Sequence, residues 1–259
     1  MFTVEQRDAL RERVLALGRD DDRVVAGAIV GSLAVDAGDR FSDLDLTFGI
    51  ADSIPVSEVL DDWSTRLVDE LDAVHLVDLQ REPTTYRVFL LPDALQLDLS
   101  MTPETEFRPA GPRFRLLFGT TAPGESRATT KAGGLFIATP SSPEEVFGWG
   151  VIYALHARAC IERGRVWQAE HYVGAVRDHA LALACLREGV IAVQARGYDD
   201  LSADTRDRFR DTHVGALEED ALRAVLASSV RSLLLEGREA EIPHAHVVSE
   251  RLAELAERP

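Results

Sequence analysis

One stretch near the N-terminus constrains the fold of this sequence more than any other. A short run of small and β-branched residues, 26–30, predicts a buried strand, and Gly31-Ser32 follows it directly. Asp43 and Asp45 come eleven and thirteen residues after Ser32, beside a second apolar run that predicts another strand. Side chains two apart on a strand share a face, so the two carboxylates converge. Such a pair can hold Mg²⁺ against phosphates, and the Gly-Ser pair lets backbone and hydroxyl donors approach a phosphate.

A third carboxylate falls on the polar side of a later predicted strand. Residues 86–91 and 95–101 are two apolar runs separated by a Pro-Asp turn signal. Alternation along the second run predicts that its leucines face the core, while Gln96, Asp98 and Ser100 face the other side. Asp98 then either points at the earlier aspartate pair or is an ordinary surface residue. Aspartate is disfavoured in strands, which favours the first interpretation.

The order of these elements is more specific than the Asp-x-Asp triplet, which also fits a solvated turn in a chain with 44 acidic residues. Strand, Gly-Ser, turn, Asp-x-Asp and strand together resemble the signature of the nucleotidyltransferase superfamily that includes polymerase β. Within it, the small bacterial aminoglycoside and lincosamide nucleotidyltransferases look most similar. The resemblance implies that Asp43, Asp45 and Asp98 bind Mg²⁺ and form the catalytic site. It also implies nucleotide binding by Gly31, Ser32, Arg40 and Ser42.

The sequence departs from that signature at one point. Many members carry an Arg-Gly pair shortly after Gly-Ser, and here Val35-Asp36 occupies that stretch. The phosphate contact of that arginine is therefore missing from its usual position. Arg40 is one candidate to replace it, and the alternative is that Gly38 supplies only the turn.

The resemblance implies a reaction but leaves its substrates open. It implies transfer of a nucleoside monophosphate, AMP from ATP being the first choice, to a hydroxyl of a small molecule, with an aminoglycoside antibiotic as one candidate. Asp98 is the first candidate for the general base, and Glu170 is the second. The rival interpretations are transfer to a protein or tRNA, as in toxin–antitoxin nucleotidyltransferases, and a non-catalytic nucleotide-binding regulator. The acceptor, the nucleobase and the oligomeric state stay open.

Charge and composition narrow the class of partner. The formal net charge of −16 and the lack of a Lys/Arg cluster argue against nucleic acid and favour a cationic acceptor, although acidity also serves solubility. No apolar run reaches about 18 residues, so no membrane span is expected. Cys160 and Cys185 lie in alanine- and leucine-rich helical segments, which predicts buried thiols. Together with an N-terminus that lacks a signal peptide's apolar core, these features predict a cytoplasmic protein.

The chain is predicted to be an α+β protein with two domains. The first, 1–125, is a nucleotidyltransferase domain with a mixed sheet flanked by helices. The linker, 126–142, is rich in Pro, Gly, Ser and Thr. The second, 143–259, is a helical bundle that binds substrate. Predicted helices cover 3–18 (ended by Gly18), 55–71, 144–163, 166–187, 190–196, 203–235 and 247–256; strands cover 24–30, 44–48, 74–79, 86–91, 95–101 and 113–118.

Two charged residues of the second domain are candidates for acceptor binding. Glu170 and Arg177 are seven residues apart on one predicted helix, so they share a face. Small residues surround them, which favours close packing or a cleft over a random solvated face. The resemblance extends here, because the antibiotic nucleotidyltransferases carry acidic acceptor-binding residues in a C-terminal helical domain. The alternative is that both are ordinary helix-surface charges.

Overall fold

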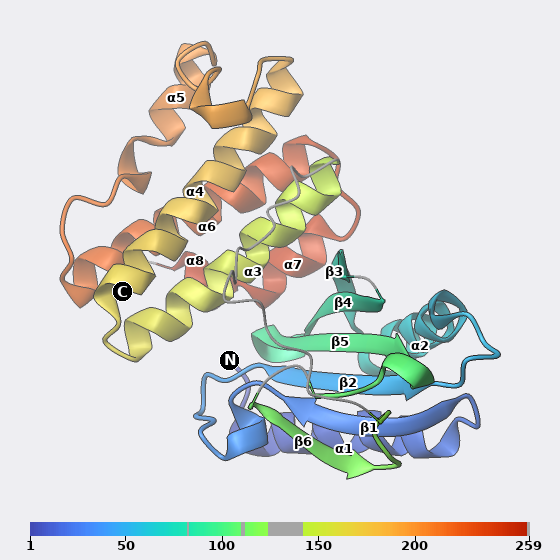
Figure 1. Ribbon diagram of the computed structural model, residues 1–259. Helices are drawn as coiled ribbons and strands as arrows, with labels where there is room; N and C mark the ends of the chain where they lie inside the picture. The colour runs from blue at the N-terminus through green and yellow to red at the C-terminus, as the bar shows by residue number, and fades with distance from the viewer. Residues whose placement is uncertain (82, 110–111, 124–141, 258–259) are drawn as a thin grey trace. The chain divides into compact units, whose positions relative to one another are not determined.

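The computed structural model describes residues 1–81, 83–109, 112–123 and 142–257 (Figure 1). The chain divides into two compact units, Met1–Phe136 and Ile137–Pro259. Residues 126–141 of the predicted linker lie outside the described part. Within the described part, no helix combines the length and the apolar character needed to cross a membrane.

A six-stranded sheet and two long helices build the first unit (Figure 1). The strands lie in the order β3-β4-β5-β2-β1-β6; β2 and β5 run parallel, and every other neighbouring pair is antiparallel. The sheet is therefore mixed, as predicted. In chain order the elements are α1 (Val4–Asp20), β1 (Val24–Val30), the 3-10 turn η1 (Leu33–Val35), β2 (Leu44–Ile50), α2 (Val56–Leu71), β3 (Val74–Arg81), β4 (Thr84–Leu91), η2 (Pro92–Ala94), β5 (Leu95–Pro103), η3 (Glu104–Glu106) and β6 (Phe114–Phe118).

The two faces of the central strands have opposite character. One face packs against α1 and α2, and Phe48 of β2 meets Trp63 of α2 edge to face with ring centroids 4.9 Å apart. The leucines of β2 and β5 share this buried face. Because side chains alternate along a strand, the opposite face receives the polar residues of the same two strands. The predicted alternation of β5 is confirmed, and it places Asp98 on the face away from both helices.

The start of the first helix follows local sequence rules, and its end does not. Thr3 caps α1 in a reciprocal capping box, in which the Thr3 hydroxyl accepts from the Gln6 amide and the Gln6 side chain accepts from the Thr3 amide. The prediction that Gly18 ends this helix is wrong, since α1 continues to Asp20. A Cβ on Gly18 would crowd the ring of Phe48, so the glycine allows α1 to approach the sheet closely.

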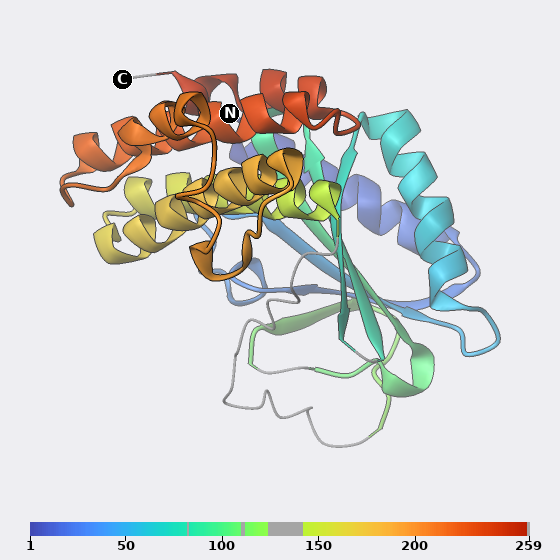
Figure 2. The ribbon, with the colours of Figure 1, turned by 90° about the horizontal axis from the view of Figure 1, so that it is seen from above.

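Three long helices form the core of the second unit, α3 (Pro143–Glu162), α4 (Val166–Glu188) and α6 (Glu219–Glu239). Figure 2 shows them side by side, and their facing surfaces bury most of the unit's apolar side chains. Cys160 and Cys185 are both buried free thiols, as predicted. Glu236 of α6 is 1% exposed at its side chain and pairs with Arg187 and Arg208. The shorter elements are η4 (Val193–Ala195), α5 (Ala203–Arg208), η5 (Arg210–Thr212), α7 (Ala245–Arg251) and α8 (Ala253–Ala256).

Two predicted helices of this unit are wrong. The segment 190–196 contains only the short turn η4, because Gly189 ends α4 in a left-handed conformation and Gln194 and Ala195 also have positive φ. The predicted helix 203–235 is two elements, α5 and α6, separated by η5 and a loop. The stretch between them contains Thr212, Val214 and Gly215, which are weak helix formers, and the Thr212 hydroxyl donates to the Phe209 carbonyl at 2.6 Å.

Candidate active site

Three aspartates meet on the polar face of the sheet. Asp43 immediately precedes β2, Asp45 lies on β2, and Asp98 lies on β5. Asp45 and Asp98 are direct partners in the parallel register of these two strands. One carboxylate oxygen from each of the three residues lies within 4.8 Å of the other two, and all three side chains are half-buried. The structure therefore brings together the three carboxylates that the sequence singled out.

Repulsion among the three carboxylates makes the ionised cluster energetically unfavourable without a cation. Burial raises the pKa of Asp45 well above its usual range, and the charges of Asp43 and Asp98 raise it further. Burial and the neighbouring Asp43 also raise the pKa of Asp98 to about 7, against an opposing hydrogen bond from Gln96. That bond runs from Gln96 Nε2 to Asp98 Oδ1 at 2.8 Å. Three carboxylates held so close favour either a bound proton or a bound cation.

The donor set fits a hard divalent cation. Mg²⁺ prefers oxygen ligands at about 2.1 Å, so two of its ligands stand at most about 4.2 Å apart. The three carboxylate oxygens lie within 4.8 Å of one another, close to this separation. Asp43, Asp45 and Asp98 are the residues that would hold such a metal.

Gly31 packs against the carboxylate of Asp45 in this cluster. Its φ is +71°, in the left-handed region, and a Cβ at this position would overlap Asp45 Oδ2. Only glycine combines that backbone conformation with room for the carboxylate. The turn after β1 and the Asp45 carboxylate thus pack directly against each other. Glycine is therefore required at position 31 for packing as well as for the predicted approach of a phosphate.

The predicted nucleotide-binding serines lie together in the loop that links β1 to β2. Ser32 Oγ donates to Ser42 Oγ at 3.2 Å. Ser42 is buried, and its hydroxyl also accepts from the Asp39 amide at 3.0 Å. Ser42 therefore stabilises the loop, and a direct contact of either serine with a nucleotide stays a prediction.

The departure from the Arg-Gly pattern has a structural counterpart. Asp36 has a φ of 53°, the left-handed conformation that glycine adopts at least cost, and Val35 is exposed. Asp36 pairs with Arg115 of β6 at 2.8 Å. The guanidinium carbon of Arg40 lies 4.3 Å from the ring centroid of Phe41, a cation–π contact. A role for Arg40 at a phosphate stays a prediction.

Sequence reasoning missed two residues that support the site. Gln96 was placed on the correct face, but its bond to Asp98 was not foreseen. Arg7 of α1 is 4% exposed, and its guanidinium donates to the backbone carbonyls of Asp39 and Ser42. Arg7 lies three residues before Leu10 and so places a charge inside the apolar stripe of α1. This unusual position is the sequence feature that could have identified Arg7.

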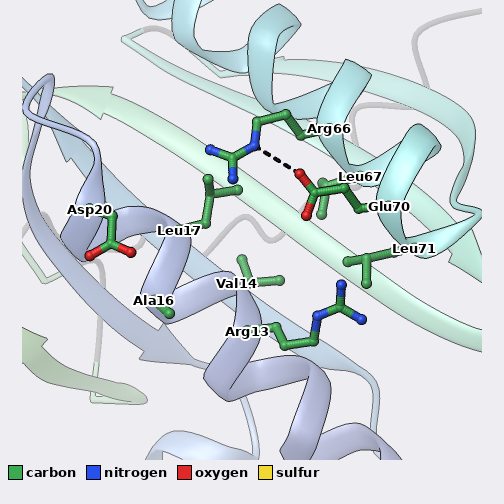
Figure 3. A pocket seen from close by; sticks show the side chains of 9 residues that line it. All are labelled: Arg13, Val14, Ala16, Leu17, Asp20, Arg66, Leu67, Glu70 and Leu71. Atoms are coloured by element: carbon green, nitrogen blue, oxygen red, sulfur yellow. Dashed lines mark hydrogen bonds and ion pairs between the residues drawn. The ribbon is translucent and has the colours of Figure 1, made fainter.

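A groove between α1 and α2 lies elsewhere in the first unit. It has a volume of about 210 Å³, and Figure 3 shows it between the two helices, with Arg66 paired to Glu70. These helices cover the face of the sheet opposite to the three aspartates, so the groove is not part of the carboxylate cluster. Its lining consists of Arg13, Val14, Ala16, Leu17, Asp20, Arg66, Leu67, Glu70 and Leu71.

The predicted acceptor-binding pair lies on α4 in the second unit. Glu170 and Arg177 are both half-buried. Arg177 donates from Nε and Nη2 to Asp178 Oδ1 at 3.0 and 2.8 Å. Among the residues that the structure describes, no ion pair joins Glu170 to Arg177. A role of either residue in acceptor binding stays a prediction.

No protein-family model matches the chain, and no curated protein matches it. Among solved structures, the chain is similar to an aminoglycoside 6-adenyltransferase from Bacillus subtilis, with 10% identity, coverage of 98% of this chain and 92% of that one, and a TM-score of 0.28. It is also similar to a nucleotidyltransferase-like protein from Exiguobacterium sibiricum, with 14% identity. That match covers 96% of this chain and 87% of the other, with a TM-score of 0.26. TM-scores and identities this low carry no conclusion about activity, which must come from the site.

Proposed function

We propose that this protein is a divalent-metal-dependent nucleotidyltransferase. The observation that carries the proposal is the meeting of Asp43, Asp45 and Asp98 beside the left-handed turn at Gly31. Carboxylates converging next to a Gly-Ser turn provide both a metal site and an approach for phosphates. The substrate is a nucleoside triphosphate, ATP being the first choice, and the acceptor is a hydroxyl of a small molecule.

In the proposed reaction the acceptor oxygen attacks the α-phosphorus of the triphosphate. The bond from the α-phosphorus to the oxygen that bridges to the β-phosphate breaks, and pyrophosphate leaves. Mg²⁺ bound by the three aspartates would neutralise charge on the phosphates. Gly31 and Ser32 would receive the triphosphate with backbone and hydroxyl donors.

Asp98 is suited to take the proton of the acceptor hydroxyl. In the metal-free site, burial and Asp43 raise its pKa to about 7. A bound divalent cation would lower that pKa and keep Asp98 ionised at neutral pH, the form that accepts a proton. The bond from Gln96 fixes Oδ1, so Oδ2 is the freer oxygen for that proton. Glu170 remains the second candidate for the base.

A cationic acceptor such as an aminoglycoside fits the acidity of the protein. The net charge is −16, and the site contains three carboxylates. Acidic surroundings attract a polyamine-like sugar and repel a polynucleotide. Transfer to a protein side chain remains the alternative acceptor class, since charge does not argue against it.

The decisive experiment offers each labelled triphosphate with Mg²⁺ to a panel of aminoglycosides and lincosamides, and detects the adduct by mass. Transfer of one nucleoside monophosphate to one acceptor supports the proposal. Labelling of a protein or of tRNA would identify the alternative acceptor. Triphosphate binding without transfer to any acceptor would favour a nucleotide-binding regulator.

A further inference from the structure

Arg7 is a buried cation that reaches from α1 into the loop ahead of the carboxylate cluster. Its Nη1 donates to the carbonyl oxygen of Asp39 at 2.6 Å and to that of Ser42 at 3.2 Å. Ser42 is covalently followed by Asp43. One guanidinium nitrogen therefore fixes two points of the backbone immediately before the first predicted metal ligand.

Stability alone gives little reason to place an arginine here. Its side chain is 5% exposed, and Nε is buried without a hydrogen-bond partner among the described residues. Asp8 Oδ1 lies 3.8 Å from Nε and compensates the charge only partly, since the Asp8 side chain is 42% exposed. A buried charge that is only partly paired carries a large desolvation penalty. A positioning role explains why an arginine occupies this place in the apolar stripe.

The other end of the same loop is held in a similar way. Arg115 of β6 donates from Nη2 to the Leu33 carbonyl at 3.0 Å and pairs through Nη1 with Asp36 at 2.8 Å. The hydroxyls of Ser32 and Ser42 join the two ends of the loop. The segment between the Gly31 turn and Asp43 is thus tied at both ends by arginines from different elements.

We propose that Arg7 is a positioning residue of the metal site. By holding the Ser42 carbonyl it sets the backbone from which the Asp43 carboxylate reaches toward Asp45 and Asp98. Without this anchor the loop samples more conformations. The entropic cost of ordering Asp43 is then subtracted from the binding free energy of the cation, so the cation binds more weakly. This inference rests on the proposed function, since it assumes that the three aspartates bind a metal.

The test measures Mn²⁺ binding to the full chain by electron paramagnetic resonance, without a nucleotide. The variants are Arg7→Met, which keeps the length of the side chain without its donors, and Arg7→Gln, whose amide is too short to reach both carbonyls. Arg13→Met removes an exposed arginine from the same helix and is the matched control. Thermal unfolding of each variant is measured in parallel.

The expected result is Mn²⁺ affinity at least about tenfold weaker in Arg7→Met and Arg7→Gln, with unfolding midpoints that are lowered but still well above the assay temperature. The control keeps wild-type affinity. Unchanged affinity in either folded Arg7 variant would overturn the positioning role. Failure of both variants to fold would also overturn it, in favour of a purely structural role. Absence of Mn²⁺ binding in the wild type would instead refute the proposed function, and the inference with it.

Discussion

Asp45 and Asp98 stand directly opposite each other in the parallel pair of strands at the centre of the sheet. Like charges across a strand pair destabilise a sheet, so this arrangement costs stability unless a cation or a proton lies between the two carboxylates. Burial and the acidic neighbours raise the pKa of Asp45 well above its usual range, which supports the proposal that the pair binds a cation.

The first prediction separates stability from activity at this pair. Asp45→Asn should abolish nucleotidyl transfer, because it removes an anionic metal ligand. The same change should raise the unfolding midpoint of the metal-free protein by about 2 to 4 °C, because it relieves repulsion in a half-buried site. Calorimetry in chelator and a transfer assay measure the two effects. Asp69→Asn, at an exposed position of α2, should change neither. An active Asp45→Asn protein would contradict the metal assignment.

The second prediction concerns the general base. Asp98→Asn should lower the transfer rate by at least about a hundredfold, the lower range for a lost acid–base group. Gln96→Leu removes the hydrogen bond to Asp98 and leaves its carboxylate, so its effect should be smaller and should appear mainly as a shift of the pH–rate profile to higher pH. If Asp98→Asn turns over normally, Asp98 is not the base, and Glu170 becomes the residue to replace.

The third prediction uses two glycines that share a backbone conformation. Gly31 has a φ of +71° and Gly164 a φ of +65°, so alanine at either position should cost about 1 to 2 kcal/mol of stability. Only at Gly31 would the new Cβ overlap a carboxylate, whereas nothing lies within 4 Å of a Cβ at Gly164. Gly31→Ala should therefore also lose metal binding and transfer, and Gly164→Ala should keep both. Equal activity of the two variants would show that Gly31 is not needed for metal binding or transfer.

Local patterns were sufficient to predict the parts of the site that local physics determines. The alternation of β5 placed Asp98 on the correct face, and the two-residue spacing of Asp43 and Asp45 placed both carboxylates together. The parallel neighbours β2 and β5 are separated in sequence by α2, β3 and β4, so their register depends on tertiary packing. Without that register the sequence could only suggest that Asp98 meets Asp45.

The residues that sequence reasoning missed act through long-range backbone contacts. Arg7 bonds carbonyls more than thirty residues away, and no residue type marks a carbonyl as an acceptor. Hydrophobic periodicity carries no information about such long-range contacts of Arg7. The helix predicted through 203–235 failed for a different reason, because the prediction passed over Thr212, Val214 and Gly215, which are weak helix formers.

The fourth prediction is a pH dependence of stability away from the site. Hydrogen bonds from Arg23, supported by one from Trp63, lower the pKa of Asp21 to about 2. The unfolded chain binds this proton more readily, so the stabilisation is complete above about pH 4 and is lost as the pH falls toward 2. Urea unfolding across this range should show a loss of about 1 to 2 kcal/mol in the wild type relative to Asp21→Asn. The exposed Asp22→Asn change should leave the wild-type profile in place.

The fifth prediction concerns the acceptor. If the acceptor is a polycation, its Michaelis constant should rise with ionic strength, because attraction between one charge and a surface carboxylate is about 1 to 4 kcal/mol and is screened by salt. Glu170→Gln should then weaken acceptor binding more than triphosphate binding, and Glu250→Gln, an exposed carboxylate on α7, should affect neither. Steady-state kinetics with each substrate varied at several salt concentrations distinguish these outcomes. An acceptor whose affinity is indifferent to salt and to residue 170 would refute the cationic-substrate idea. The proposal of metal-dependent transfer would survive that result, because it rests on Gly31 and the three aspartates.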